Sequence, residues 1–240
     1  MSEARAKCSL PAINVSMTTP QSAIDCLASK KLIIFDWDGT LMDSIGLIVE
    51  AMHSAGEAHG FSTTDRQVKD IIGLSLDIGI DILYPNATVE QRLAIQKSYS
   101  DYYIANSYRT PFFSDIEVML QKLQQQGKLL AVATGKKRRG LDRVLTASNS
   151  HDYFVSTRCA DESASKPDPK MLLEVLQAVD KQVTEAVYIG DSIYDIQMAN
   201  KIGMTSIAVD YGTAASAELA AQWPTYQVAT PQALANLLSI

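Results

Sequence analysis

The chain has 240 residues, and 47% of them are hydrophobic, which is enough to bury a substantial core in one domain with an insertion or in two small domains. A formal net charge of -6 argues against a general nucleic-acid binder or a binder of anionic membranes. Three scattered cysteines argue against a disulfide framework and a structural zinc site. The sequence has no apolar run of signal-peptide or membrane-spanning length, so we expect a cytoplasmic protein.

The first part of the chain combines an N-terminal arm, one strand and a helical block. Residues 1–29 are rich in proline, serine and threonine and are expected to form a mobile arm, although Ile24 and Leu27 could pack against the body. The apolar run 32–35 predicts a strand covered on both faces. Apolar residues then recur at helical spacing, which predicts helices near 45–60, 65–72, 75–83 and 88–107.

From residue 113 onward, helical and strand patterns alternate. Strands are expected at 128–133, 153–157, 186–190, 205–209 and 226–229. Helices are expected at 115–126, 138–147, 168–179, 193–202, 214–222 and 231–239. This alternation predicts a doubly wound parallel α/β sheet. The catalytic core would comprise 30–44 and 113–240, with an all-helical cap, 45–112, inserted after the first strand.

Residues suited to phosphate chemistry gather at the predicted strand ends. Because the carboxyl ends of parallel strands share one edge of the sheet, these side chains should converge there. Taken alone, an Asp-x-Asp-Gly sequence fits an acidic turn equally well, but the whole set matches the nucleophile, proton donor and charge carriers that phosphoryl transfer needs. The set comprises Asp36, Asp38, Thr134, Lys166, Asp191 and Asp195.

This set of side chains also predicts a metal ion. Carboxylates alone would repel a phosphate group, so a divalent cation is expected to offset them. Oxygen ligands together with a phosphate favour Mg²⁺, with Asp36 and Asp191 as side-chain ligands. Lys166 would supply a fixed positive charge, and Thr134 a hydroxyl, to the transferring group.

Four motifs in this order resemble those of the haloacid dehalogenase superfamily, close to its phosphoglycolate-phosphatase-like branch. The pattern D-x-D-G-T-L-x-D-S stands at 36–44, the second-motif threonine at Thr134, the lysine at Lys166, and G-D-S-x-x-D at 190–195. The resemblance covers about 30–240, and it implies the Rossmannoid core and inserted helical cap of that family.

The resemblance also implies a role for each motif residue. Asp36 would attack phosphorus and form an aspartyl-phosphate, and Asp38 would act as the acid and then the base and lend its backbone carbonyl to the metal. Asp191 would bind the metal directly, and Asp195 would act through water or Lys166. As an alternative, Asp195 could be only a first-turn acid that the helix dipole favours. The residues expected to contact the phosphate are Gly39, Thr40, Thr134, Gly135 and Lys166.

The predicted function is a magnesium-dependent phosphatase that hydrolyses a small phosphorylated metabolite, phosphoglycolate being one candidate. Dehalogenases and phosphonatase-like members lack the carboxylate that stands here as Asp38, and Ile48 occupies the place where the sugar-phosphate mutases carry a cap histidine. Two alternatives stay open: a phosphotransferase or mutase of the same fold, and a binding or regulatory module without turnover. A monomer or weak dimer is expected.

Three features of the cap and its surroundings have two readings each. The sequence 73–76 resembles a short substrate-facing loop, but it could equally be a break between two helices. The basic run 136–139 could attract an anionic substrate, although a solvated face is the more common role of such a run. Several tyrosines late in the cap are expected to pack between helices, with substrate stacking as the minor alternative; they are Tyr99, Tyr102, Tyr103 and Tyr108.

Overall fold

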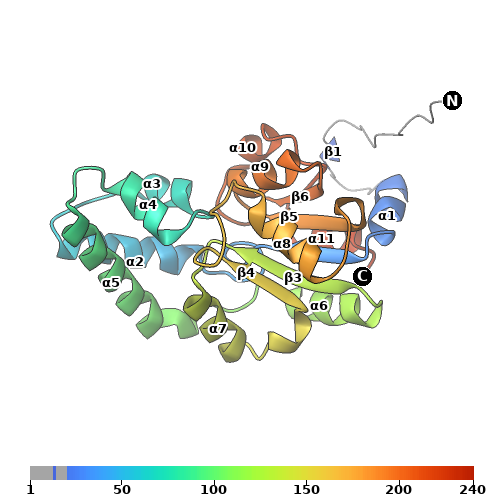
Figure 1. Cartoon of the computed structure of the whole chain (residues 1–240), viewed down its shortest axis with the longest axis horizontal. Helices are drawn as coiled ribbons and strands as arrows, with labels where there is room; N and C mark the ends of the chain where they lie inside the picture. The colour runs from blue at the N-terminus through green and yellow to red at the C-terminus, as the bar shows by residue number, and fades with distance from the viewer. Residues whose placement is uncertain (1–12, 15–20) are drawn as a thin grey trace.

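A parallel β-sheet organises the chain, and the computed structural model describes residues 13–14 and 21–240 (Figure 1). Seven strands lie in the order β1-β7-β6-β5-β2-β3-β4, and all neighbouring pairs run parallel. The strands are β1 (Ile13–Asn14), β2 (Leu32–Phe35), β3 (Leu129–Thr134), β4 (Ser156–Cys159), β5 (Ala186–Gly190), β6 (Thr205–Val209) and β7 (Tyr226–Val228). The predicted α/β class with a parallel sheet is confirmed.

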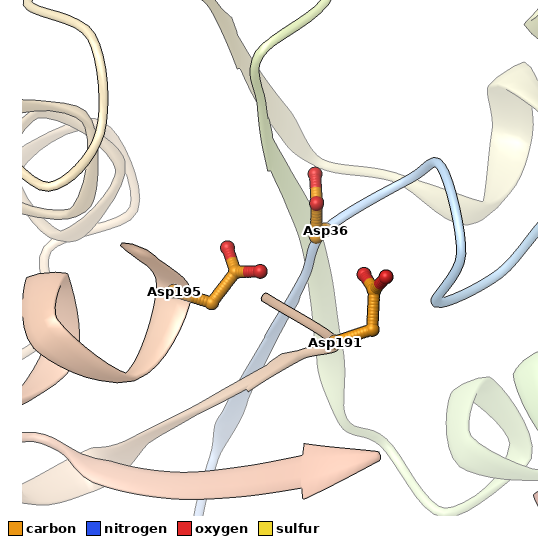
Figure 2. A group of neighbouring side chains, drawn as sticks. All are labelled: Asp36, Asp191 and Asp195. Atoms are coloured by element: carbon orange, nitrogen blue, oxygen red, sulfur yellow. The ribbon is translucent and has the colours of Figure 1, made fainter. Parts of the chain in front are cut away.

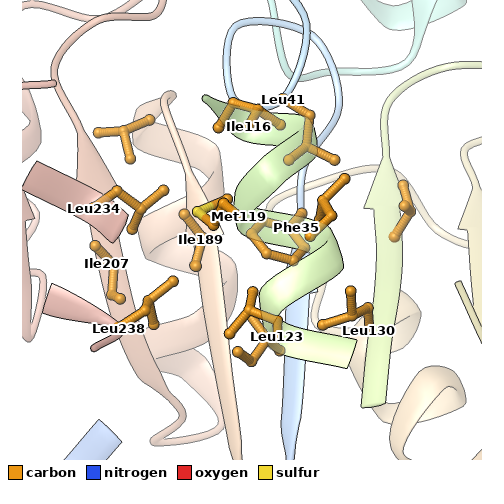
Figure 3. Close-up of a cluster of buried hydrophobic side chains, with 14 of the residues drawn as sticks. Phe35, Leu41, Ile116, Met119, Leu123, Leu130, Ile189, Ile207, Leu234 and Leu238 are labelled. Atoms are coloured by element: carbon orange, nitrogen blue, oxygen red, sulfur yellow. The ribbon is translucent and has the colours of Figure 1, made fainter. Parts of the chain in front are cut away.

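Helices cover both faces of this sheet, which explains why β2 is apolar throughout. Successive strand residues point to opposite faces, so Phe35 and Leu32 bury themselves in different clusters. On the face of Phe35, residues of α6 and α11 pack above the strands (Figure 3). On the other face, α8 and α9 supply the partners of Leu32. The core helices are α6 (Ile116–Gln125), α7 (Arg138–Ala147), α8 (Lys170–Ala178), α9 (Ile193–Lys201), α10 (Ser216–Ala220) and α11 (Pro231–Leu237).

Four further helices form a separate lobe beside the sheet, seen on the left of Figure 1. They share their own cluster of buried residues, in which Met52 and Ile95 contribute from the two longest helices. Threonine caps fix two of the starts, because Thr64 and Thr88 each form a reciprocal capping box with the glutamine three residues later. The helices are α2 (Ile45–Ala58), α3 (Asp65–Ile71), α4 (Leu76–Leu83) and α5 (Val89–Asn106).

The last part of the arm predicted at 1–29 forms a helix, and the packing of Leu27 against the body, which was expected as an alternative, is observed. Helix α1 (Gln21–Ala28) buries Ala23 and Leu27 in the main core, which provides the apolar contacts that hold it in place. The strand pair β1 and β7 adds the short segment 13–14 to the sheet. The rest of the arm lies outside the described residues.

One predicted strand is displaced along the sequence. A strand was expected at 153–157, but β4 begins at Ser156. Tyr153 ends a short 3-10 turn, and Phe154 packs its ring edge-on to Trp37 at a centroid separation of 6.0 Å. The apolar residues that suggested the strand are therefore anchors of the preceding turn, and the polar edge strand follows them.

Among residues 13–14 and 21–240, no helix combines the length and apolar character that a crossing of the bilayer requires.

Candidate active site

The ends of four adjacent strands place the candidate residues at one edge of the sheet. Asp36 follows β2 directly, and β2 lies between β5 and β3 in the middle of the sheet. Asp191 follows β5, Thr134 ends β3, and Lys166 lies in the loop between β4 and α8. Open parallel sheets bind ligands at this edge, at the point where the order of the strands along the chain reverses. Residues up to 155 positions apart in the sequence thus meet as neighbours.

A buried lysine joins two of the carboxylates. Lys166 Nζ lies 2.8 Å from Asp36 Oδ1 and 2.8 Å from Asp195 Oδ1, and all three side chains are almost completely shielded from solvent. Burial opposes the charge on Lys166, but Asp195 and Asp36 outweigh that effect and raise its pKa. The lysine therefore keeps its charge, and a permanent cation stands beside Asp36.

Burial and neighbouring negative charges raise the pKa values of the carboxylates Asp36 and Asp191. Burial, opposed by Lys166 and assisted by the charge of Asp195, raises the pKa of Asp36 to about 7. Burial, together with the negative charges of Asp36 and Asp195, raises the pKa of Asp191 well above its usual range. One lysine thus faces more carboxylate charge than it can balance, and this excess favours a further cation.

Asp191 sits in a cradle of hydrogen-bond donors and glycines. Its Oδ1 accepts a bond of 2.8 Å from the Thr40 hydroxyl, and its Oδ2 accepts one of 2.8 Å from the backbone N–H of Thr213. A Cβ atom at Gly39 or Gly212 would clash with the same carboxylate. The sequence analysis missed Gly212 and Thr213, because they follow β6 in a loop that carries no family motif.

Asp195 has all of its partners within the protein. Its Oδ1 accepts from the Tyr188 hydroxyl at 2.7 Å and forms an ion pair with Lys166, and its Oδ2 accepts from the backbone N–H and the hydroxyl of Ser192. Ser192 and Asp195 form a capping box at the start of α9. Asp195 therefore caps its helix and also forms an ion pair with Lys166, and its role beside the metal stays a prediction.

The three aspartates could hold a metal ion. Asp36, Asp191 and Asp195 each offer an oxygen, and these atoms lie within 4.8 Å of one another. In Figure 2, Asp36 and Asp191 extend side by side from different strands, and Asp195 points toward them from α9. Each oxygen of Asp195 already has two partners, whereas each oxygen of Asp191 accepts a single hydrogen bond, so Asp36 and Asp191 have the greater capacity for a cation. An all-oxygen set with uncompensated negative charge fits Mg²⁺.

Asp38 belongs to a different ion pair. Lys136 Nζ lies 2.7 Å from its Oδ2 and 2.8 Å from its Oδ1, and the Ser44 hydroxyl donates to Oδ1 at 2.6 Å. The lysine also stands over the Tyr103 ring, 4.7 Å from its centroid. A solvated face was the favoured interpretation of this basic run, and it is wrong for Lys136. In the sequence, the position of Lys136 directly after Thr134-Gly135, at the end of a buried strand, was the feature that could have indicated its place at the site.

A cavity of about 250 Å³ opens between this edge of the sheet and the helical lobe. Asp36, Asp38, Thr134 and Gly135 line it from the sheet side. The segment 73–76 lines it from the lobe, as do Tyr99 and Tyr103, whose rings stack at 6.0 Å. By contrast, the Tyr102 hydroxyl donates to Glu50 and Tyr108 is largely exposed.

The segment 73–76 also touches the core directly. The backbone N–H of Ser75 donates to the Ser165 hydroxyl at 2.9 Å, one residue before Lys166. An added Cβ at Gly135 would lie 2.5 Å from the Leu74 carbonyl oxygen and 2.8 Å from that of Gly73. The lobe therefore closes over Thr134 and Asp36 by backbone contacts that require a glycine.

Two predicted phosphate-binding residues lie behind the carboxylates. Thr40 is completely buried with its hydroxyl committed to Asp191, and Gly39 adopts a φ of 78° against the same residue. Neither lines the cavity, and neither does Lys166, whose Nζ is paired with Asp36. Phosphate binding by these three residues stays a prediction.

Known proteins are similar to this chain in sequence and in fold. The profile of the haloacid dehalogenase-like hydrolases matches residues 33–209. A phosphoglycolate phosphatase from Vibrio vulnificus is 31% identical over 220 residues, covering 88% of this chain and 95% of that protein. A Caldanaerobacter subterraneus protein described as a pyrophosphatase is 28% identical over 196 residues, covering 81% and 88%.

Solved structures agree with these sequence matches. A Bacteroides fragilis protein described as a haloacid dehalogenase-like hydrolase superposes with a TM-score of 0.78 at 28% identity, covering 85% of this chain and 99% of that one. A hydrolase from Pseudomonas syringae gives a TM-score of 0.81 at 23% identity and shares the fold. With a family match that spans well over half of its length, this chain is an enzyme of the haloacid dehalogenase-like hydrolase family.

Proposed function

We propose that the protein is a magnesium-dependent phosphatase that acts on a small phosphate ester through a covalent intermediate at Asp36. The observation that carries this proposal is the pairing of two carboxylates with different surroundings at one cavity. Asp36 lies beside the buried Lys166, and Asp38 lies beside Lys136 on the same cavity wall. Two carboxylates in different environments suit a nucleophile and a separate acid-base group.

In the first step, an oxygen of Asp36 attacks phosphorus and the bond to the ester oxygen breaks. Asp38 enters this step in its protonated form and gives its proton to the departing alkoxide, so the alcohol leaves neutral. The ion pair of Asp38 with Lys136 is the form that results from this step. Lys166 holds the Asp36 carboxylate in place and offsets its negative charge. Thr134, buried at the end of β3, offers a hydroxyl to the transferring group.

In the second step, water attacks the phosphorus of the aspartyl-phosphate. Asp38, now ionised, accepts a proton from this water, and the bond between phosphorus and the Asp36 oxygen breaks. Inorganic phosphate and the original form of both aspartates result. The lobe lies over the cavity and restricts the access of bulk water to the intermediate.

Asp36 and Asp191 would hold Mg²⁺ through their side chains, and Asp38 would add its backbone carbonyl. When bound, the ion would offset the negative charge that the phosphate and carboxylates bring together. Asp195 would stay outside the metal and act by orienting Lys166. The crowding of buried carboxylates around one lysine supports this arrangement.

Phosphoglycolate is one candidate substrate, because a relative 31% identical to this chain bears the name phosphoglycolate phosphatase. Another relative at a similar distance is described as a pyrophosphatase, so the relatives support the reaction class better than one substrate. A mutase or phosphotransferase would replace water with an acceptor alcohol. The presence of Asp38 beside Asp36 argues against a pure binding module, which needs no acid-base partner.

A comparison of products tests the proposal. With Mg²⁺ and p-nitrophenyl phosphate, we expect inorganic phosphate to appear in step with nitrophenol, and Asp36→Asn to lower the rate by at least about 10³-fold. Asp43→Asn, at an exposed position of the same motif, is the matched control. An Asp36→Asn rate within about tenfold of the wild-type rate would remove Asp36 as the nucleophile. Transfer of phosphate to an added alcohol in place of water would favour a phosphotransferase.

A further inference from the structure

The walls of the cavity differ sharply from its phosphate end. Beyond Asp36 and Asp38, the surface that faces the cavity is made mostly of aliphatic and aromatic side chains of the lobe. They include Ile48, Met52, Ile72, Leu74, Tyr99 and Tyr103. At about 250 Å³, the cavity falls below the roughly 300–1,000 Å³ of sites for drug-sized ligands, so it suits a compact group of about one ring.

Two arginines on helix α7 line the same cavity. Arg139 and Arg143 are four residues apart and therefore lie on one face of the helix. The preceding residues of the basic run are paired, since Lys137 lies 3.0 Å from Asp77 and Arg138 lies 2.8 Å from Glu162. Within the described part of the chain, the side chains of Arg139 and Arg143 form no ion pair and no hydrogen bond.

Arg139 and Arg143 thus add two unpaired positive charges to a cavity whose lobe side is mostly apolar. By contrast, the lining residues Lys136 and Lys137 already have carboxylate partners. Like charges four residues apart on a helix repel each other, and an anion between them would relieve the repulsion. Guanidinium groups are also the side chains best matched to carboxylate and phosphate oxygens, because they offer several N–H donors in one plane. The cavity therefore offers an anion site in addition to the phosphate end at Asp36.

Resting on the phosphatase function proposed above, we infer that the substrate is a monophosphate ester whose alcohol part has a compact apolar body and a second anionic group. Asp36 takes the phosphate, the lobe encloses the apolar body, and Arg139 and Arg143 bind the second anion. Phosphoglycolate satisfies only part of this description, because it has a second anion but no apolar body to fill the lobe side of the cavity.

Three esters that all release primary alcohols separate these requirements. Benzyl phosphate has the apolar body alone, phosphoglycolate has the second anion alone, and 3-carboxybenzyl phosphate has both. We expect kcat/KM, measured by phosphate release with Mg²⁺, to be about tenfold higher for 3-carboxybenzyl phosphate than for either of the others. A kcat/KM for 3-carboxybenzyl phosphate that is equal to or lower than those for benzyl phosphate and phosphoglycolate would overturn the inference.

A charge-matched pair of variants assigns the preference to the arginines. In Arg139→Gln/Arg143→Gln, the ratio of kcat/KM for 3-carboxybenzyl phosphate over benzyl phosphate should fall to near one. Lys122→Gln/Lys201→Gln, which removes two charges at exposed positions on α6 and α9 outside the cavity, should keep the wild-type ratio. A ratio that survives the arginine substitutions would contradict the anion site.

The same assays distinguish this inference from the proposed function. Absence of phosphate release from all three esters in the wild-type protein would contradict the phosphatase function, and the substrate class would fall with it. Release from all three without a preference for 3-carboxybenzyl phosphate would contradict the substrate class and leave the phosphatase function intact.

Discussion

Lys136 Nζ lies 2.7 Å from Asp38 Oδ2, in a pair that solvent scarcely reaches. Burial opposes the charge of this lysine, but Asp38 and the neighbouring tyrosines outweigh it and raise the pKa of Lys136. The same ammonium group donates to the Tyr103 hydroxyl at 3.3 Å. One side chain therefore fixes the proposed acid-base residue and joins it to a helix of the lobe.

Replacing this lysine should disturb the chemistry more than the binding. Lys136→Met leaves Asp38 without the cation that holds both of its oxygens, so we expect kcat to fall by about 10²-fold with a smaller change in KM. Lys136→Arg, which keeps the charge, should recover part of the loss. A kcat for Lys136→Met close to the wild-type value would show that Asp38 needs no such positioning.

The glycine at the contact between lobe and core gives a second test. Gly135→Ala would place a Cβ 2.5 Å from the Leu74 carbonyl oxygen, so the lobe must move away from Asp36. We expect kcat/KM for p-nitrophenyl phosphate to fall by about tenfold while the melting temperature changes little. Gly46→Ala, in helix α2 with nothing within 4 Å, is the matched control. Equal activity in both variants would argue against closure of the lobe as a requirement.

The buried carboxylates should make stability depend on pH and on metal. In the folded protein the pKa of Asp36 is raised to about 7, and that of Asp191 is also raised. At a pH above the ordinary pKa of an aspartate and below these raised values, the folded protein therefore binds more protons than the unfolded chain. The free energy of unfolding of metal-free protein should therefore fall as pH rises through 7.

Thermal melting measures this effect. Between pH 6 and pH 8, we expect the melting temperature of EDTA-treated protein to fall by roughly 5 °C. Mg²⁺ should restore more of it at pH 8, where Asp36 has lost its proton. Asp191→Asn should show a smaller dependence on both. A metal-free protein that becomes more stable toward pH 8 would contradict the crowding of charge at this site.

Sequence patterns predicted those parts of the molecule that depend on local periodicity and on motif order. Strand β2 was predicted at its observed bounds because its four residues are apolar and buried on both faces. The motif residues Asp36, Lys166 and Asp191 were predicted to converge because parallel strands end at a common edge.

Contacts that depend on tertiary packing could not be predicted in this way. Lys136 looked like part of a solvated basic run, since nothing local shows that Asp38 and Tyr103 lie opposite it. Thr213 binds Asp191 through its backbone N–H, a contact that leaves no trace in residue type. Helix α1 was placed in an arm because of the proline, serine and threonine that precede it, and of its two buried residues the sequence suggested Leu27 but not Ala23.

The covalent step at Asp36 is tested most directly in Asp38→Asn. With p-nitrophenyl phosphate the leaving group needs no proton, so phosphoryl transfer to Asp36 should proceed, whereas attack by water lacks its base and the intermediate should accumulate. After rapid acid quench and peptide mapping by mass spectrometry, we predict a phosphoryl group on the peptide that contains Asp36, and none when Asp36→Asn is added. Release of nitrophenol and phosphate by Asp38→Asn, with no phosphorylated Asp36 at any quench time, would contradict the proposed reaction.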